Sequence, residues 1–64
     1  MPAINNEKLR ELRQKKLLTQ AELAEMAGVR SATIADLERG KHRPRPSTIR
    51  KIAAALGIRP EALV

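Results

Sequence analysis

Apolar residues recur along the chain every three or four positions, which predicts helices separated by short turns. The clearest stripe is Ile49, Ile52, Ala53 and Leu56, which follows the i, i+3, i+4, i+7 spacing of one buried helical face. Nowhere do β-branched residues alternate with polar ones over four or more positions, as they would along a half-buried strand. The pattern therefore predicts an all-α protein.

Capping residues set the expected ends of these helices. Thr19 and Glu22 have the spacing of a capping box, in which each side chain bonds to the other residue's backbone amide. Glycines at positions 28, 40 and 57 follow three of the apolar stripes and supply natural helix stops. We expect helices over about 6–16, 20–27, 31–39 and 46–56, followed by a short turn that Pro60 opens.

Two of these helices are short and are joined by a tight glycine turn. Ala24 is small at the point where the two helices must cross, as in a helix-turn-helix. The chain resembles the Cro/phage-repressor (XRE-like) helix-turn-helix family. The resemblance rests on segments 20–29, 33–34 and 37–41 and on Pro44, Thr48, Lys51, Ala53, Ala55, Leu56, Gly57 and Leu63.

This resemblance implies both a fold and a function. The fold would be a compact bundle of five helices, as in lambda-repressor-like DNA-binding domains, with residues 1–64 forming a single domain. The function would be sequence-specific binding of double-stranded DNA, with the second helix of the motif (about 31–39) in the major groove and the first across the backbone. Such a protein would be a transcriptional regulator in the prokaryotic cytoplasm, associated with the nucleoid.

Charge and composition point the same way and exclude other classes. The 64 residues include 13 Lys and Arg against 7 Asp and Glu, a net charge of +6, so we expect an anionic partner. Six cations and no acid lie between Arg39 and Lys51. With no Cys, no aromatic residue and one histidine (His42), we expect no enzyme activity, no metal, no cofactor and no stacking on single-stranded nucleic acid. The apolar runs are too short for a membrane span, and we expect no small-molecule ligand.

The resemblance also implies contacts for individual residues. The residues implied to face base edges are Arg30, Ser31, Ala32 and Asp36. The residues implied to hold phosphates are Thr19, Gln20, Thr33, Arg39, Lys41, Arg43 and Arg45. Arg13 and Glu38 are implied to form a partly buried bidentate ion pair that ties the first helix to the recognition helix.

Several of these residues leave alternatives open. The family usually has Ser or Thr at position 30, so Arg30 either reads guanine, binds a phosphate or stays in solvent, and Ser31 can take over capping one residue later. Asp36 either accepts a hydrogen bond from cytosine N4 or pairs with Arg30 or Arg39. Ala32 either touches a thymine methyl group or provides clearance.

The oligomeric state and the class of function are open as well. A small apolar end is the candidate surface for a homodimer, and we expect a monomer in dilute solution with weak pairing on DNA; this surface comprises Ile58, Ala62, Leu63 and Val64. The same fold serves in antitoxins and coactivators, where a partner protein is bound, but we see no extension for such a partner. The tidy caps and the aliphatic core also suit an engineered DNA binder on this scaffold.

Overall fold

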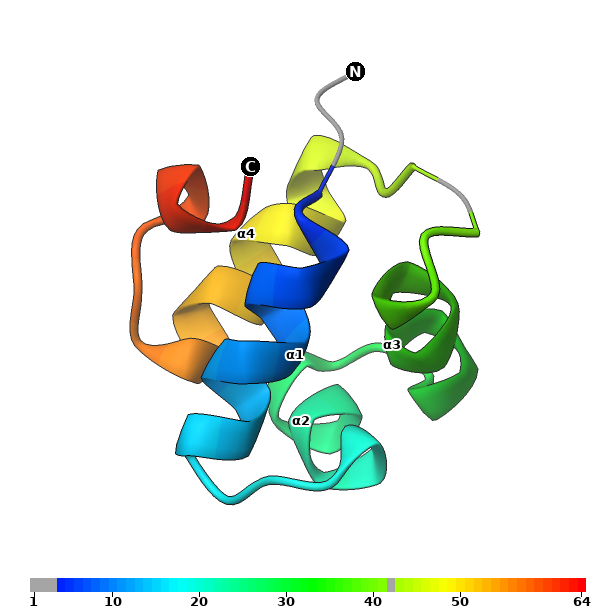
Figure 1. Ribbon diagram of the computed structural model, residues 1–64, viewed down its shortest axis with the longest axis vertical. Helices are drawn as coiled ribbons and strands as arrows, with labels where there is room; N and C mark the ends of the chain where they lie inside the picture. The colour runs from blue at the N-terminus through cyan, green and yellow to red at the C-terminus, as the bar shows by residue number, and fades with distance from the viewer. Residues whose placement is uncertain (1–3, 42) are drawn as a thin grey trace.

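The computed structural model describes residues 4–41 and 43–64, which form four α-helices and one 3-10 helix (Figure 1). The elements in chain order are α1 (Asn6–Lys15), α2 (Gln20–Ala27), α3 (Ser31–Glu38), α4 (Pro46–Leu56) and the 3-10 helix η1 (Pro60–Leu63). These described residues contain no strand, and the all-α prediction is confirmed. None of their helices is long and apolar enough to cross a membrane. His42 lies outside the described residues.

The expected fifth helix is not an α-helix. Gly57 ends α4 with a φ of 70°, and the chain turns before η1 begins. In η1 the amide of Ala62 donates to the carbonyl oxygen of Arg59, and the amide of Val64 donates to that of Glu61, which is the i→i+3 pattern of a 3-10 helix. The five-helix prediction is therefore wrong in its last element, where the bundle has a single 3-10 segment.

A core of aliphatic side chains holds the elements together. α2 packs against both α3 and α4, α1 packs against α3 and η1, and η1 also packs against α4. Every element contributes to the largest fully buried side chains, which are Leu9, Leu23, Ile34, Leu37, Ile52, Leu56 and Leu63. Leu63 was expected on an exposed apolar surface, but this residue is 0% exposed, and the amide of Asn5 donates to its carbonyl oxygen. Leu63 therefore belongs to the core.

The helix ends follow the predicted caps with one exception. Thr19 and Glu22 form both hydrogen bonds of the capping box, and Gly28 ends α2 in the left-handed conformation with a φ of 72°. Arg30 is the cap residue of α3, and its side chain makes no capping hydrogen bond. The alternative in which Ser31 caps one residue later is wrong, because Ser31 is already the first residue of the helix.

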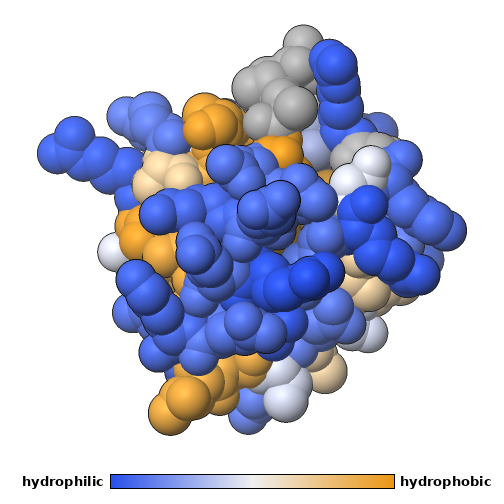
Figure 2. All heavy atoms as spheres, in the orientation of Figure 1, coloured by the Kyte–Doolittle hydropathy of each residue, from blue (hydrophilic) through white to orange (hydrophobic). Residues whose placement is uncertain are grey.

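The turn between α1 and α2 contains a strained residue. Leu17 has a φ of 57° and is the one non-glycine with positive φ in the described ranges. An L-residue in this conformation brings its Cβ close to the following carbonyl oxygen. The side chain of Leu17 is also 90% exposed, so packing does not offset the strain. Figure 2 shows hydrophobic atoms protruding at the lower left, where this turn lies, from a face that is mostly hydrophilic.

Replacing Leu17 with glycine should stabilise the protein. Leu17→Gly removes the left-handed strain and loses no packing, and part of the gain is offset by the greater freedom of glycine in the unfolded chain. We expect the free energy of unfolding to rise by about 0.5–1 kcal/mol in denaturant titrations. Leu17→Ala is the control, because it removes the exposed side chain but keeps the strain. Equal stability of the two variants would contradict the role of backbone strain.

Candidate nucleic-acid interface

One side of α3 faces outward as a continuous stripe. Ala32, Asp36 and Arg39 are spaced i, i+4, i+7 and therefore share one helical face. Ala32 and Arg39 are exposed, and Asp36 is partly exposed. The opposite side of α3 carries Ile34, Leu37 and Glu38, which are buried. The fold therefore presents three of the predicted contact residues together, on a helix whose other side is fixed in the core.

The N-terminal end of α3 is open and carries a cation. Arg30 is exposed, and no side chain caps the helix there. Ser31 is exposed beside it. Uncapped amides at the start of a helix, together with the positive end of its dipole, favour an anion. This end of α3 is therefore suited to a phosphate or to the acceptor edge of a base.

A polar hollow lies beside α3, where the chain enters α4. Thr33, Arg43, Pro44, Arg45 and Thr48 line this hollow, whose volume is about 370 Å³. Three of these residues (Thr33, Arg43 and Arg45) were predicted to hold phosphates, and the fold brings them together. Thr48 was quoted in the family resemblance but not as a contact. Its position in the first turn of α4 is the signal that could have placed its hydroxyl at the site.

The remaining predicted contacts lie at the start of α2 and after α3. Lys41 is exposed, and its backbone amide donates to the carbonyl oxygen of Asp36. Thr19 is exposed, and its hydroxyl oxygen accepts from the amide of Glu22. The side-chain Nε2 of Gln20 donates inward to Oε1 of Glu38 at 3.1 Å, and the phosphate contact of this residue stays a prediction. One of its two amide hydrogens is thereby used within the protein and not on a phosphate.

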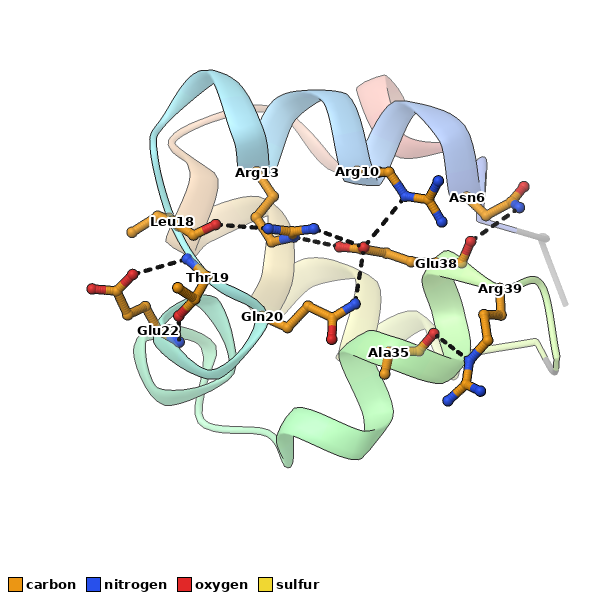
Figure 3. A network of polar contacts seen from close by, with 10 residues as sticks. All are labelled: Asn6, Arg10, Arg13, Leu18, Thr19, Gln20, Glu22, Ala35, Glu38 and Arg39. Atoms are coloured by element: carbon orange, nitrogen blue, oxygen red, sulfur yellow. Dashed lines mark hydrogen bonds and ion pairs between the residues drawn. The ribbon is translucent and has the colours of Figure 1, made fainter.

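The buried carboxylate of Glu38 joins α1, α2 and α3 behind the outward stripe of α3 (Figure 3). The side chain of Glu38 is 1% exposed. Arg13 donates to it from Nε at 2.6 Å and from Nη2 at 3.0 Å, and the same guanidinium donates from Nη1 to the carbonyl oxygen of Leu18 at 2.7 Å. The bidentate pair expected between Arg13 and Glu38 is thus formed, and it also anchors the turn between α1 and α2.

Two further residues of this network were not expected from the sequence. Nε of Arg10 lies 3.6 Å from Oε1 of Glu38, and its side chain is 53% exposed. Asn6 donates from Nδ2 to the carbonyl oxygen of Glu38 at 3.3 Å. Arg10 lies one turn before Arg13 on α1, which is the signal that could have suggested a second cation. In the part of the chain that the structure describes, no buried side-chain nitrogen or oxygen lacks a hydrogen-bond partner.

The network keeps the Glu38 carboxylate ionised. Burial raises the pKa of Glu38, but the hydrogen bonds from Arg13 and Gln20 and the charges of Arg13 and Arg10 together hold that pKa below its ordinary value. The hydrogen bond between Arg13 and Glu38 also raises the pKa of the Arg13 guanidinium. The described residues contain no group of three His, Cys, Asp or Glu side chains that could hold a metal ion.

Comparison with protein families and curated proteins gives consistent matches. A family model described as helix-turn-helix matches residues 9–63. An uncharacterised HTH-type transcriptional regulator of Bacillus subtilis, RghRB, is 46% identical over 59 residues, which cover 91% of this chain and 42% of that protein. The immunity repressor protein of Bacillus phage phi105 is 38% identical over 58 residues, which cover 91% of this chain and 40% of the repressor. The chain therefore spans about two fifths of the length of these curated relatives.

Solved structures with the same arrangement of helices include a controller protein and a repressor. The restriction-modification controller protein C.AhdI from Aeromonas hydrophila is 37% identical with a TM-score of 0.89, and the match covers 92% of this chain and 89% of that one. The P22 c2 repressor in complex with a synthetic operator is 28% identical with a TM-score of 0.86, over 97% of this chain and 96% of that one. The relatives carry the names of regulators and repressors, in agreement with the expectation of a non-enzymatic protein.

Removing one partner of the buried ion pair should destabilise the protein strongly. Arg13→Ala leaves the Glu38 carboxylate buried without its bidentate donor, which costs about 3–5 kcal/mol. Thermal unfolding should show a Tm lower by more than about 10 °C. Arg10→Ala is the matched control, because the Arg10 side chain is half exposed and its contact with Glu38 should contribute less than about 1 kcal/mol. An unchanged Tm for Arg13→Ala would contradict a structural role of the pair.

Glu38 should also make the stability depend on acid pH. Because its pKa is lowered in the folded state, its contribution is present above the ordinary carboxyl value of 4.5 and is lost as the pH falls through the lowered folded-state pKa. Glu38→Gln should be less stable at neutral pH and should show a flatter decline of Tm toward low pH. Glu61→Gln, which removes an exposed carboxylate, is the control and should keep the wild-type profile. A Glu38→Gln profile parallel to the wild type would rule out this dependence.

Proposed function

Because the chain belongs to the helix-turn-helix family, we propose that it binds double-stranded DNA in a sequence-specific manner and acts as a transcriptional regulator, or as an engineered DNA binder on that scaffold. The observation that carries this proposal is the outward stripe of α3, with the exposed cation Arg30 before the helix and the exposed cations Lys41, Arg43 and Arg45 after it. Residues 1–64 act as one domain in this proposal. A regulator of this kind would work in the cytoplasm, at the nucleoid.

The helix α3 enters the major groove in this proposal. Its outer side carries Ala32 and Asp36, and its first turn carries Arg30 and Ser31, which are the four residues proposed to face base edges. The small side chain of Ala32 supports a close approach of the helix axis to the bases. The exposed guanidinium of Arg30 supports a bidentate contact with guanine, which is the commonest specific contact of arginine with a base.

The phosphate contacts come from both sides of α3. On one side lies the polar hollow with the guanidinium groups of Arg43 and Arg45 and the hydroxyls of Thr33 and Thr48. Beyond the other side, the start of α2 offers its backbone amides and the side chain of Thr19. Lys41 adds an exposed cation at the end of α3. Contacts on both sides fix the register of the helix in the groove, while the base edges supply specificity.

A second copy can bind beside the first. An apolar hollow of about 270 Å³ lies near the C-terminal end and is lined by Pro46, Ile49, Arg50, Pro60, Glu61 and Val64, of which Val64 is 55% exposed. This surface differs from the one expected from the sequence, since Leu63 is buried. We propose that it supports weak pairing on DNA, because two copies related by a two-fold axis would cover it reciprocally.

Selection from a random duplex pool tests this function. The chain is incubated at moderate salt with duplexes that contain a randomised region, and the bound DNA is sequenced. One enriched block of about 4–6 base pairs supports a monomer that reads bases, and two inverted blocks about one helical turn apart support a pair. Retention without any enriched sequence, lost as salt rises, would contradict specific reading. No retention would favour the alternative in which the fold binds a partner protein.

The cations of the polar hollow should contribute equally to the binding affinity for every duplex, whatever its sequence. Arg43→Gln and Arg45→Gln should each weaken binding to the enriched duplex and to an unrelated one by a similar factor. Each should lower the slope of log K against log[salt] by about 0.9, as expected for one lost phosphate contact. Arg59→Gln is the matched control, because the segment that carries Arg59 lies on the opposite side of the molecule from α3 (Figure 1). A slope equal to the wild type in both hollow variants would contradict phosphate binding there.

A further inference from the structure

We propose that Asp36 and Arg39 form a reading pair in which the carboxylate holds the guanidinium for guanine, so that Arg39 is a base contact and not a phosphate contact. This inference rests on the proposed DNA binding by α3 and concerns which base pair the helix reads. It reassigns Arg39 from the phosphate contacts implied by the family resemblance to the group of residues that determine specificity.

The first observation is the path of the Arg39 side chain. Its Nε donates to the carbonyl oxygen of Ala35 at 3.4 Å, and its Nη2 lies 3.4 Å from Oδ1 of Asp36. Both partners lie toward the N-terminus of α3, about one turn before Arg39. Long side chains on a helix lean in this direction. The guanidinium therefore lies level with the middle of the helix and not over the loop that follows it (Figure 3).

The second observation is the position of both residues on the helix. Arg39 lies on the same outward stripe as Ala32 and Asp36, directly opposite the buried side of α3. The cations assigned to phosphates, Arg43 and Arg45, lie instead beside the helix in the polar hollow. In a helix-turn-helix the N-terminal part of the recognition helix contacts base edges, and residues beside the helix contact the backbone. Arg39 follows the last residue of α3, but its side chain reaches back to Ala35 and Asp36, which carries the guanidinium toward the part of the helix that meets the bases.

The chemistry of the pair fits guanine. The contacts with Ala35 and Asp36 use Nε and one Nη2 hydrogen of Arg39. One N–H on Nη1 and one on Nη2 are then available as two parallel donors. This pair of donors matches the O6 and N7 acceptors of guanine in the major groove. A guanidinium that is already held by a carboxylate loses less conformational freedom on binding than an extended one.

The pair also explains an acid on a surface proposed to meet DNA. A lone carboxylate there would repel phosphates, whereas a carboxylate paired with Arg39 is compensated. The side chains of Arg39 and Asp36 are 59% and 32% exposed, so the ion pair contributes little to folding stability. The contact between Asp36 and Arg39 is therefore better explained if Asp36 positions the Arg39 guanidinium than if the pair stabilises the helix.

The test compares the sequences selected by the wild-type chain and by variants from the same random duplex pool. Asp36→Asn and Arg39→Gln should both lose the preference for guanine at the same base pair. Arg39→Lys should lose it too, because lysine keeps the charge but lacks the fork. The relative affinity for guanine at that pair should fall by roughly 5- to 150-fold. Arg43→Gln is the control and should weaken binding without changing the enriched motif, and all variants should keep the wild-type Tm.

Three results would overturn the reading pair. If Arg39→Gln and Arg39→Lys keep the wild-type motif, Arg39 does not read a base. If Asp36→Asn and Arg39→Gln relax different base pairs, the two residues act separately. If the wild-type chain enriches no motif, both the reading pair and the proposed function fail, and this outcome is thereby distinguished from failure of the pair alone.

Discussion

The buried carboxylate of Glu38 is the interaction on which the arrangement of the helices depends. It accepts hydrogen bonds from Arg13 on α1 and Gln20 on α2, while its own backbone belongs to the last turn of α3. The core around it is entirely aliphatic, and contacts between aliphatic side chains have little directional preference. Hydrogen bonds to a charged group are directional and short. We infer that this network, more than the core, sets how α3 is rotated relative to α1 and α2.

The rotation of α3 links the network to the proposed function. With Glu38 fixed in the interior, the helical spacing turns Ala32, Asp36 and Arg39 outward on one stripe. A rotation of the helix about its axis would move that stripe away from the groove and would also expose the buried carboxylate. The energetic cost of leaving Glu38 unpaired therefore opposes such a rotation. Arg13 is far from the reading surface in sequence, yet it maintains the orientation of that surface.

Much of the fold could be predicted from the sequence, because the signals are local. The capping box of Thr19 and Glu22, the stop at Gly28 and the apolar stripe of α4 depend on residues within a few positions of one another. The features that could not be predicted from the sequence depend on contacts between distant segments or on backbone geometry. The inward turn of Gln20, the addition of Arg10 to the network and the burial of Leu63 depend on distant segments. They require knowledge of which side chains meet, which spacing alone does not contain.

A direct test of this account is a map of the DNA-binding face by nuclear magnetic resonance. The ¹⁵N-labelled chain is titrated with the duplex enriched in the selection, and the amide shifts are followed residue by residue. The largest changes should fall on α3, on residues 41 and 43–45 and on the first turn of α2, while residues 57–64 change little if one copy binds. Changes centred on the Leu17 turn or spread evenly over the chain would contradict this account, because the outward stripe of α3 would then not be the surface that meets DNA.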